Sequence, residues 1–551
     1  MTLLRFPGRR GPGRTALASA ALAALAGFPA THAATLVVNN SGDDGNPTCD
    51  SQTCNLRAAI QAANSGDEIV FSPNLPYPLT IRLAAALGIG KNLVIQHPQP
   101  GAVTLDAGAG QPGHRVLEIT NQADVRISGL RLTGGRVSGT DGTNGAGPGA
   151  AGATGGNGGG GCVWVAQAAR LTLQSVVVRG CESRGGRGGN GAAGRAGQAG
   201  TVGAYQQNGR DGENGGLGGA GGTGGLGLGG GLLTDGDLIL LDSSVVSNTT
   251  RAGFGGNGGA GGKGGRGGNG GPGGGSGTGG NGGQGGDGGN GGAGGGGGEG
   301  IGGGVTVGWT GTVQAVNTLI ADNRAFGESN GDPGIAGEAG TGGNGGVGGE
   351  QGEPGADGVA GTVGARARPG SGTGGGLSTN GASNAGLLSF VSVVKNFAGP
   401  GATTATSSAD GVARAGGLGY FGAIGLRNSI LADNTIHPAV ASNCYLVPPA
   451  QISGSNFSTT PACNVNAVDA RSGVVYDDSG AMPLARLEPD SPAVDLVADC
   501  TVQANGILNT MDQRGAARPQ DGDGDGNAHC DIGAYEADGI ASERIFRSGF
   551  E

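Results

Sequence analysis

Aromatic residues make up only 3% of the 551 residues and charged residues 13%, and no apolar run after the N-terminal segment is long enough to cross a bilayer. So few aromatic side chains exclude a conventional enzyme core spread over the whole length. The net charge is −10 and no basic stripe occurs, so we expect no nucleic-acid partner. No Cys-x-x-Cys spacing is present, which disfavours a cysteine metal site.

Glycine, in contrast, supplies 133 residues, and most of them lie in tracts. Every third residue is glycine over 185–230, 255–303 and 331–364, with exceptions at Gln206 and Ser276. This period matches an extended helix of three residues per turn, so a folded-back sheaf of polyglycine helices is one interpretation. Flexible loops are the alternative, because glycine loses the most entropy on ordering and the tracts offer few apolar side chains. Collagen-like trimerisation is disfavoured by the scarcity of proline over 185–230 and 255–303.

Five copies of a repeat remain between the tracts. Each begins with two or three glycines, continues with alternating apolar residues and ends after 17 to 20 residues at a small residue, namely Gly180, Asn248, Asn323, Asn396 and Asn434. Three residues earlier stands an aliphatic side chain: Val177, Val245, Ile320, Val393 and Leu431. Short β-branched segments bounded by turns indicate strands. We therefore predict a parallel β-helix in which the aliphatic positions stack inside and the four asparagines form an amide ladder or, alternatively, serve as simple turn residues.

The segments before the repeats have the same character. Strand-like pieces occupy 92–96, 102–107, 115–119 and 124–134, and 56–64 shows one apolar face at helical spacing. A helix there would cover the open strand edges at the end of a β-helix. The predicted organisation is a signal peptide (1–33), an N-terminal cap (34–71), a β-helix (72–440), glycine-rich insertions (135–161, 182–230, 252–303 and 327–376), a C-terminal region (441–540) and a short tail (541–551).

The N-terminal segment has the features of a Sec signal. Four arginines precede an Ala/Leu-rich run at 15–28, and small residues favour a cut near Ala33. Export makes disulfides the expected state of the eight cysteines. The simplest of the possible pairings joins sequence neighbours: Cys49–Cys54, Cys162–Cys181, Cys444–Cys463 and Cys500–Cys530.

Two segments resemble a known group. The sequence TCNLRAAIQAANSGDEIVF, which begins at Thr53, is similar to the CSLREA-type N-terminal segment of secreted bacterial β-helix proteins. The sequences DSPAVDLVADC (490–500) and DQRGAARPQDGDGDGNAHCDIGAYE (512–536) resemble the terminal region of choice-of-anchor Q proteins. The resemblance implies an all-β, right-handed parallel β-helix of the pectin-lyase-like type outside the cytoplasm, and it implies no defined reaction. No apolar anchor follows at the C-terminus.

The strongest candidate for a ligand site is DGDGDGN at 521–527. Alternating carboxylates followed by glycine are typical of calcium loops. We predict Asp521, Asp523, Asp525, Asn527 and Asp531 as ligands of a structural Ca²⁺, although position 12 is Ile532 and the motif is no complete EF-hand. A solvated acidic turn is the alternative, and no cofactor is required.

Catalytic motifs are weak. Asp43-Asp44 and Asp477-Asp478 lie outside the predicted coils, Asp242, Asp322 and Asp433 occur singly, and the histidines are scattered. Trp164 and Trp309 are interpreted as packing residues rather than sugar platforms. We therefore expect a non-catalytic, monomeric, secreted or surface protein with a structural or adhesive function that binds glycans or partner proteins. The alternative is a polysaccharide lyase or glycoside hydrolase with a groove along the rod, which a cluster of acidic and basic residues on neighbouring coils would favour.

Overall fold

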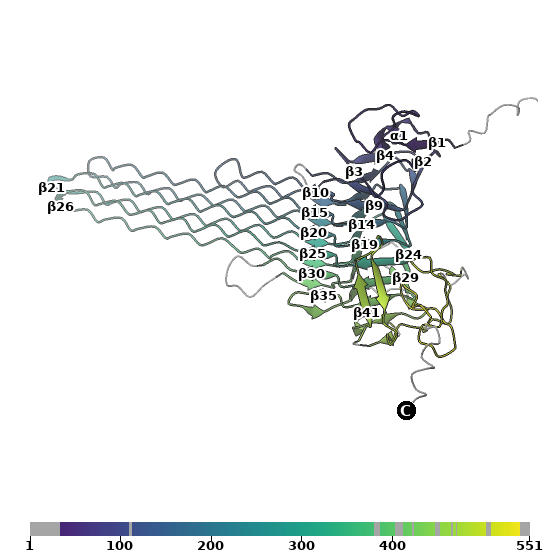
Figure 1. The fold of residues 1–551 in the computed structure, drawn as a ribbon. Coiled ribbons are helices and arrows are strands. Elements are labelled where there is room, and N and C mark those ends of the chain that lie inside the picture. The colour runs from purple at the N-terminus through teal and green to yellow at the C-terminus, as the bar shows by residue number, and fades with distance from the viewer. Residues whose placement is uncertain are drawn as a thin grey trace, which may run out of the picture.

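The computed structural model describes residues 33–108, 113–379, 386–402, 411–420, 424–446, 452–463, 465, 467–469, 471–502 and 508–539. The expected signal peptide before Ala33 and the tail at 541–551 lie outside these ranges. In the described residues the strands stack in parallel, coil upon coil, and form the predicted right-handed parallel β-helix. A broad, flat projection leaves one side of this rod (Figure 1).

Each complete coil contributes five short strands, which stack on their equivalents in the next coil. The first face consists of β1 (Thr35–Val38), β2 (Glu68–Phe71), β5 (Leu93–Gln96), β8 (Asp124–Ser128), β13 (Arg170–Gln174), β18 (Asp237–Leu241), β24 (Thr312–Ala321), β29 (Gly386–Val394), β33 (Ile424–Arg427) and β38 (Ile452–Ser453). The second face consists of β3 (Leu79–Arg82), β6 (Val103–Asp106), β9 (Leu130–Thr133), β14 (Val177–Arg179), β19 (Ser244–Val246), β34 (Ile430–Ala432), β39 (Phe457–Ser458), β40 (Ala467–Val468) and the second halves of β24 and β29.

Three narrower sheets complete the coils. One contains β10 (Arg136–Ser138), β15 (Glu182–Arg184), β20 (Thr249–Arg251), β25 (Arg324–Phe326), β30 (Phe397–Gly399), β35 (Thr435–Ile436) and the antiparallel β36 (Val440–Ala441). The next contains β11 (Gly158–Gly159), β16 (Gly227–Leu228), β22 (Gly300–Ile301), β27 (Gly372–Thr373) and β31 (Ala413–Arg414). The last contains β4 (Leu87–Ile89), β7 (Leu117–Ile119), β12 (Val163–Val165), β17 (Leu232–Thr234), β23 (Val305–Val307), β28 (Leu377–Thr379), β32 (Leu418–Tyr420) and β37 (Cys444–Leu446).

The interior consists of aliphatic columns, as predicted, with one shift of register. Val245 pairs with Ile320, Ile320 with Val393 and Val393 with Leu431, and all four are fully buried. In the first copy Val178, and not the predicted Val177, pairs with Val245. The reason is that Cys181, and not Gly180, takes the place of the asparagine in that coil, where its backbone N–H donates to Asn248 Oδ1.

The expected amide ladder is present. The Nδ2 of Asn248 donates to Asn323 Oδ1, that of Asn323 to Asn396 Oδ1 and that of Asn396 to Asn434 Oδ1, at 2.9–3.0 Å. Each amide also donates to a backbone carbonyl of the preceding coil, and the ladder continues to Asn443, which the sequence did not single out. The side chains are fully buried, so these bonds fix the turn between the second face and the next strand.

Substituting Asn323 with alanine is expected to lower the free energy of unfolding by about 2–4 kcal/mol. The change removes a buried amide and leaves the backbone N–H of Asn248 and the carbonyl of Val245 without their partners, each at about 1–3 kcal/mol. Thermal unfolding of the variant should show this loss. As a control, Asn214→Ala removes a single, exposed bond to Asp287 N and should change stability little. Equal effects of the two variants would contradict the buried ladder.

The N-terminal boundary differs from the prediction in two respects. Helix α1 (Leu56–Ala62) is shorter than 56–64, because the backbone turns extended at Ala63. Its first turn is capped by Asn55, whose side chain accepts from Ala58 N. In addition, β1 and β2 lie within the expected cap of 34–71 but already pair as strands of the first coils. At the other end, β37 to β40 extend the coils beyond residue 440.

The C-terminal region packs against the rod instead of extending it. Antiparallel β41 (Val474–Asp477) and β42 (Leu484–Leu487) follow the short helix η1 (Pro461–Cys463). Apolar side chains of the second face and its edge, among them Ile430 in β34 and Phe390 at the bend of β29, are buried in one cluster with Val494, Ile532 and Tyr535 of this region. The region therefore covers the second face across several coils (Figure 1). No helix among the described residues is long and apolar enough to span a membrane.

Candidate functional site

The glycine tracts form the feature that distinguishes this rod. Four hairpins leave successive coils between the narrow sheets, with outgoing chains 139–147, 185–205, 253–273 and 327–347 and returning chains 149–157, 207–226, 279–299 and 350–371. Together we call them the blade (Figure 1). The exceptions to the glycine period mark hairpin tips, since Gln206 lies in the turn of the second hairpin and Ser276 in β21 (Gly274–Thr278). The tip strand β21 pairs with β26 (Gly348–Glu350) at the far end.

Hydrogen bonds join every chain of the blade to its neighbours with a period of three. Gly258 donates to the carbonyl of Asp332 in the next outgoing chain, Gly259 donates to Gly219 in a returning chain, and Ala260, the third residue, is partly exposed. The N···O distance of both bonds is 2.8 Å. Three residues per turn are thus ordered, and the sheaf is the interpretation that the structure supports. Coils of a β-helix stack about 4.8 Å apart, so hairpins from successive coils leave the rod already within bonding distance.

Glycine occurs where a neighbouring chain lies. A Cβ on Gly189 would stand 2.0 Å from the carbonyl oxygen of Thr143 in the first hairpin. That hairpin is short, and beyond its end the equivalent positions of the second hairpin are Arg195, Gln198 and Thr201. Bulky side chains at an uncovered edge hinder the addition of further chains. The alternation of Gly-Gly-x and Gly-x-x triplets therefore follows the packing of the blade.

The outer surfaces of the blade carry rows of amides. On the outgoing side, Oδ1 of Asn144 accepts from Asn190 N, Asn190 from Asn257 N and Asn257 from Asp332 N, at 2.8–2.9 Å. The side chains of Asn144, Asn190 and Asn257 are exposed, which makes their amide donors accessible to solvent. A shallow cavity of about 590 Å³ lies here at the base of the blade, lined by this row and by Arg187, whose guanidinium stands over Phe254 at 4.9 Å.

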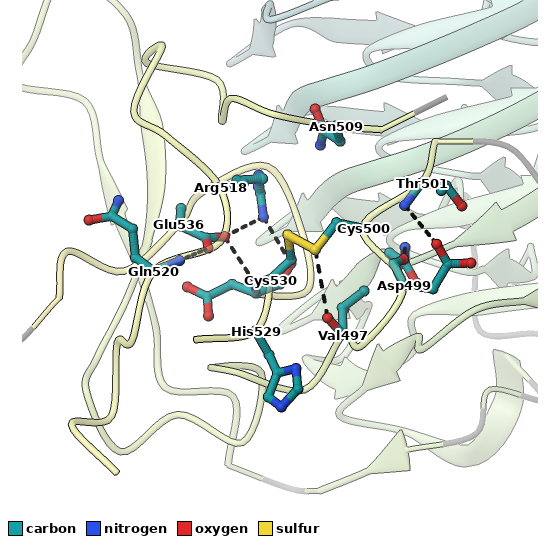
Figure 2. The surroundings of a disulfide bond; sticks show 12 residues. Val497, Asp499, Cys500, Thr501, Asn509, Arg518, Gln520, His529, Cys530 and Glu536 are labelled. Atoms are coloured by element: carbon teal, nitrogen blue, oxygen red, sulfur yellow. Dashed lines mark hydrogen bonds and ion pairs between the residues drawn. A yellow bond between two sulfur atoms is a disulfide. The ribbon is translucent and has the colours of Figure 1, made fainter. Parts of the chain in front are cut away.

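The four disulfides are those predicted, and all eight cysteines are paired. Cys162–Cys181 joins the start and end of one coil, whereas Cys500–Cys530 joins two segments of the C-terminal region. Around the latter, Val497 N donates to the carbonyl of Cys530, and Arg518 and Glu536 lie beside the sulfurs (Figure 2).

The acidic loop gathers only part of the predicted ligand set. Asp521 and Asp523 lie together, and Asp495, which sequence reasoning missed, completes a group of three carboxylates whose oxygens lie within 4.8 Å of one another. Asp525 accepts from Asn527 N within its own turn, and neither residue belongs to the group. Asp531 is buried and accepts from Asp495 N and Ala537 N. Asp495 lies 26 residues before Asp521, so no local spacing in the sequence indicates that it belongs to this group.

Three carboxylates fit the ligand chemistry of Ca²⁺, which accepts oxygen donors with flexible geometry. The carboxylate of Asp495 also accepts from Gly522 N, Asp523 N and His529 N, which holds it under the loop. A cation bound to Asp495, Asp521 and Asp523 would neutralise their mutual repulsion and tie the loop to the C-terminal region. The calcium site itself stays a prediction.

Calcium is expected to raise the unfolding midpoint, and a chelator to reverse this. Binding at a hundredfold excess over Kd is worth about 2.7 kcal/mol. The shift should vanish in Asp495→Asn and persist in Asp525→Asn, because only the former belongs to the cluster. The measurement is thermal unfolding in the presence of about 1 mM Ca²⁺ and, separately, of a chelator. A midpoint that is insensitive to calcium, or equally affected in both variants, argues against the site.

A second cluster of charges is buried between the C-terminal region and the rod. Arg518 pairs with Glu536 at 2.6 Å, and both side chains are fully buried. The Arg518 guanidinium also donates to the carbonyls of Asp531 and Gly533, and its carbon stands 4.8 Å from the ring centre of Phe390 in β29. Burial, assisted by the charge of Glu536, raises the pKa of Asp531 to about 7. Arg518 Nε is buried without a hydrogen-bond partner, but each charged side chain of the cluster is held by other bonds, so the cluster is best explained as the anchor of this region.

The described coils carry acidic and basic residues on neighbouring turns at more than one place: Arg136 of β10 pairs with Glu182 of β15 at 2.7 Å, and a set of three lies on the first face. On the first face, Arg170 lies between Asp237, at 3.0 Å, and Asp124, at 3.8 Å. Aspartates of the two Asp-Asp sequences outside the predicted coils also form ion pairs with arginines. Asp43 binds Arg57, Asp477 binds Arg486 and Asp478 binds Arg179. A ring nitrogen of His114 bonds to the carbonyl of Leu83.

The two tryptophans differ from each other. Trp164 is half-buried, with its indole N–H bonded to Asp235, and the guanidinium of Arg115 lies 5.5 Å from its ring centre. Trp309 lies in the turn between β23 and β24 and is 68% exposed, so the interpretation as a packing residue is wrong for this side chain. In this turn most of the ring is in contact with solvent.

Comparisons with known proteins add little to this geometry. No family model matches the sequence, and no curated protein is similar to it. Among solved structures, pectate lyase Pel9A is 13% identical, with a TM-score of 0.25, over 92% of this chain and 96% of its own. A PL6 alginate lyase in complex with a trisaccharide is 9% identical, with a TM-score of 0.16, over 88% and 95%. At these values the likeness carries no argument about activity.

Proposed function

We propose that this protein is a secreted or surface-displayed, non-catalytic adhesive module that binds extracellular glycans through its blade. The observation that carries the proposal is the blade itself: eight chains, bonded backbone to backbone, that hold rows of outward side chains at fixed spacing. Such a surface is preorganised, because the backbone that carries its side chains is already ordered before a ligand binds. The rod then serves as the scaffold, and the protein acts as a monomer exported after cleavage near Ala33.

The outgoing surface is the favoured binding face. Its amide row at Asn144, Asn190 and Asn257 leaves donor groups free for hydroxyl and ring oxygens of a sugar, beside the guanidinium of Arg187. Amide and guanidinium donors in a shallow open cavity suit a polymer that lies across the surface better than a small molecule that must be enclosed.

The test is retention of the purified mature protein on a panel of immobilised polysaccharides. Changing Asn144, Asn190 and Asn257 together to alanine should weaken retention at least tenfold. The matched control changes Asn208, Asn281 and Asn290 on the returning side, each of which makes the same type of bond to the next chain. If both triple variants bind like the wild type, or if no polysaccharide is retained, the adhesive proposal fails.

A second candidate function is polysaccharide cleavage on the first face, favoured by the Asp124–Arg170–Asp237 set on adjacent coils. Arg170 bridges both carboxylates in the open, which leaves neither poised as an unpaired base. The same panel distinguishes the two proposals. Release of reducing ends or unsaturated products by the wild type, lost in the Asp124→Asn/Asp237→Asn variant, would establish the enzyme and contradict the non-catalytic function.

A further inference from the structure

The first described residues of the chain lie beside a buried carboxylate. Ala33 and Ala34 are exposed and directly precede β1. The backbone nitrogen of Ala34 lies 2.7 Å from Oδ1 of Asp67, and its carbonyl accepts from Glu68 N at 2.9 Å. Both backbone groups of this one residue are therefore fixed where the chain enters the rod.

Asp67 is positioned to receive a positive charge. It is 5% exposed, it lies between the end of α1 and the start of β2, and its second oxygen accepts from Asn64 N at 2.7 Å. The N–H groups of Asn64 and Ala34 lower the pKa of the Asp67 carboxyl, so it is ionised at neutral pH. In the described residues no lysine or arginine lies within ion-pair distance of it. A buried carboxylate with hydrogen bonds but no counter-ion gains from one.

We propose that removal of the leader after Ala33 creates an α-ammonium group on Ala34 that Asp67 holds as an ion pair, which makes the mature N-terminus a structural part of the cap. The inference rests on the proposed export. A signal peptidase adds water across the Ala33–Ala34 bond, so that Ala33 leaves as a carboxylate and the Ala34 nitrogen becomes an ammonium. A cut elsewhere would leave an uncharged amide here or remove Ala34 altogether.

Two other charged groups face this position. Glu68 on β2 accepts from the hydroxyl of Thr35 and from Gln96. The Lys91 ammonium binds the carbonyls of Gln61 and Ala63 at the end of α1 and acts on Asp67 from a distance. Before cleavage these groups, with Asp67, sum to one negative charge. The new ammonium makes the cluster neutral.

The first measurement is the N-terminal sequence and mass of the exported protein, which should begin at Ala34. The second is the rate at which an acylating reagent labels this α-amine at pH 7. An adjacent carboxylate that raises the pKa of the amine by about one unit makes labelling about tenfold slower than in Asp67→Asn. As a control, Asp124→Asn changes an exposed carboxylate two coils from Asp67, and the α-amine of this variant should be labelled at the wild-type rate.

A second comparison does not depend on correct folding of the Asp67→Asn variant. A chain with Gly-Ser before Ala34 carries no charge at this nitrogen. The ammonium gains a partner on folding, so its pKa is higher in the folded protein than in the unfolded chain. Its contribution to stability is therefore complete below about pH 7.7, the pKa of a free α-amine, and is lost as the pH increases through the pKa of the folded form. The unfolding midpoint of the mature form should therefore fall relative to the extended form between about pH 8 and pH 10.

Each result decides between the possibilities. Export with a start other than Ala34, equal labelling in wild type and Asp67→Asn, or identical pH profiles of the mature and extended forms would overturn the capture of the N-terminus and leave export intact. A protein that retains residues 1–33 would contradict the proposed export instead.

Discussion

Replacing Gly262 with valine is expected to unfold the middle of the blade. A Cβ at this position would stand 2.0 Å from the carbonyl oxygen of Arg195 and 2.6 Å from its carbon, both backbone atoms of a bonded chain. Relief requires the outgoing chains to separate, which breaks hydrogen bonds such as Gly194 N to Ala260 O. Overpacking together with unmade backbone bonds amounts to about 3–5 kcal/mol of local stability.

The matched control is Ala260→Val, two residues earlier in the same chain. Ala260 occupies the third position of its triplet and is partly exposed, so a larger side chain there has access to solvent. Limited proteolysis with a protease of broad specificity should cut Gly262→Val within 253–299 and spare Ala260→Val and the wild type. Equal resistance of the two variants would mean that no chain lies against Gly262.

Arg518→Met is expected to have the second large effect, at the C-terminal region. The change removes the only cation paired with Glu536 among the described residues and leaves this carboxylate beside Asp531. Removing one partner of a buried ion pair costs about 3–5 kcal/mol. Burial already raises the pKa of Glu536, and without the guanidinium this pKa will rise further. The region should therefore detach from the second face.

Detachment exposes the apolar surface around Phe390 and Ile430, which a hydrophobic fluorescent dye reports. Arg170→Met serves as the control, because its ion pairs with Asp124 and Asp237 are exposed and worth at most about 1 kcal/mol. Dye binding by Arg518→Met but not by Arg170→Met is the expected result. A variant that stays folded without dye binding would show that apolar contacts alone hold the region.

Most of the rod could be predicted from the sequence because its signals are local. The column of Val245, Ile320, Val393 and Leu431 and the ladder of Asn248 to Asn434 recur at fixed distances from the glycines, and the structure confirms both. The disulfides followed from proximity along the chain. The first copy was misaligned by one residue because glycine and cysteine adjoin there and only the stacking partner distinguishes Gly180 from Cys181.

The blade and the carboxylate cluster depend on contacts that are remote in sequence. Gly188 bonds to Phe254 and Gly258 to Asp332, and a single tract offers no apolar burial to offset the entropy of its glycines. Order arises only because the rod brings successive hairpins together. Asp495 joins Asp521 and Asp523 for a similar reason, since its place is set by the fold of the C-terminal region.

The most direct test of this account is hydrogen exchange of glycine amides in the full-length mature protein, labelled selectively with ¹⁵N-glycine and followed by NMR. The bonded amides of the central hairpin, such as Gly256, Gly259 and Gly262, should exchange at least a hundredfold more slowly than free chain, comparably to glycines within the coils. Exchange of these amides at the rate of an unstructured chain, while the coil amides stay protected, would contradict the blade and with it the proposed binding surface.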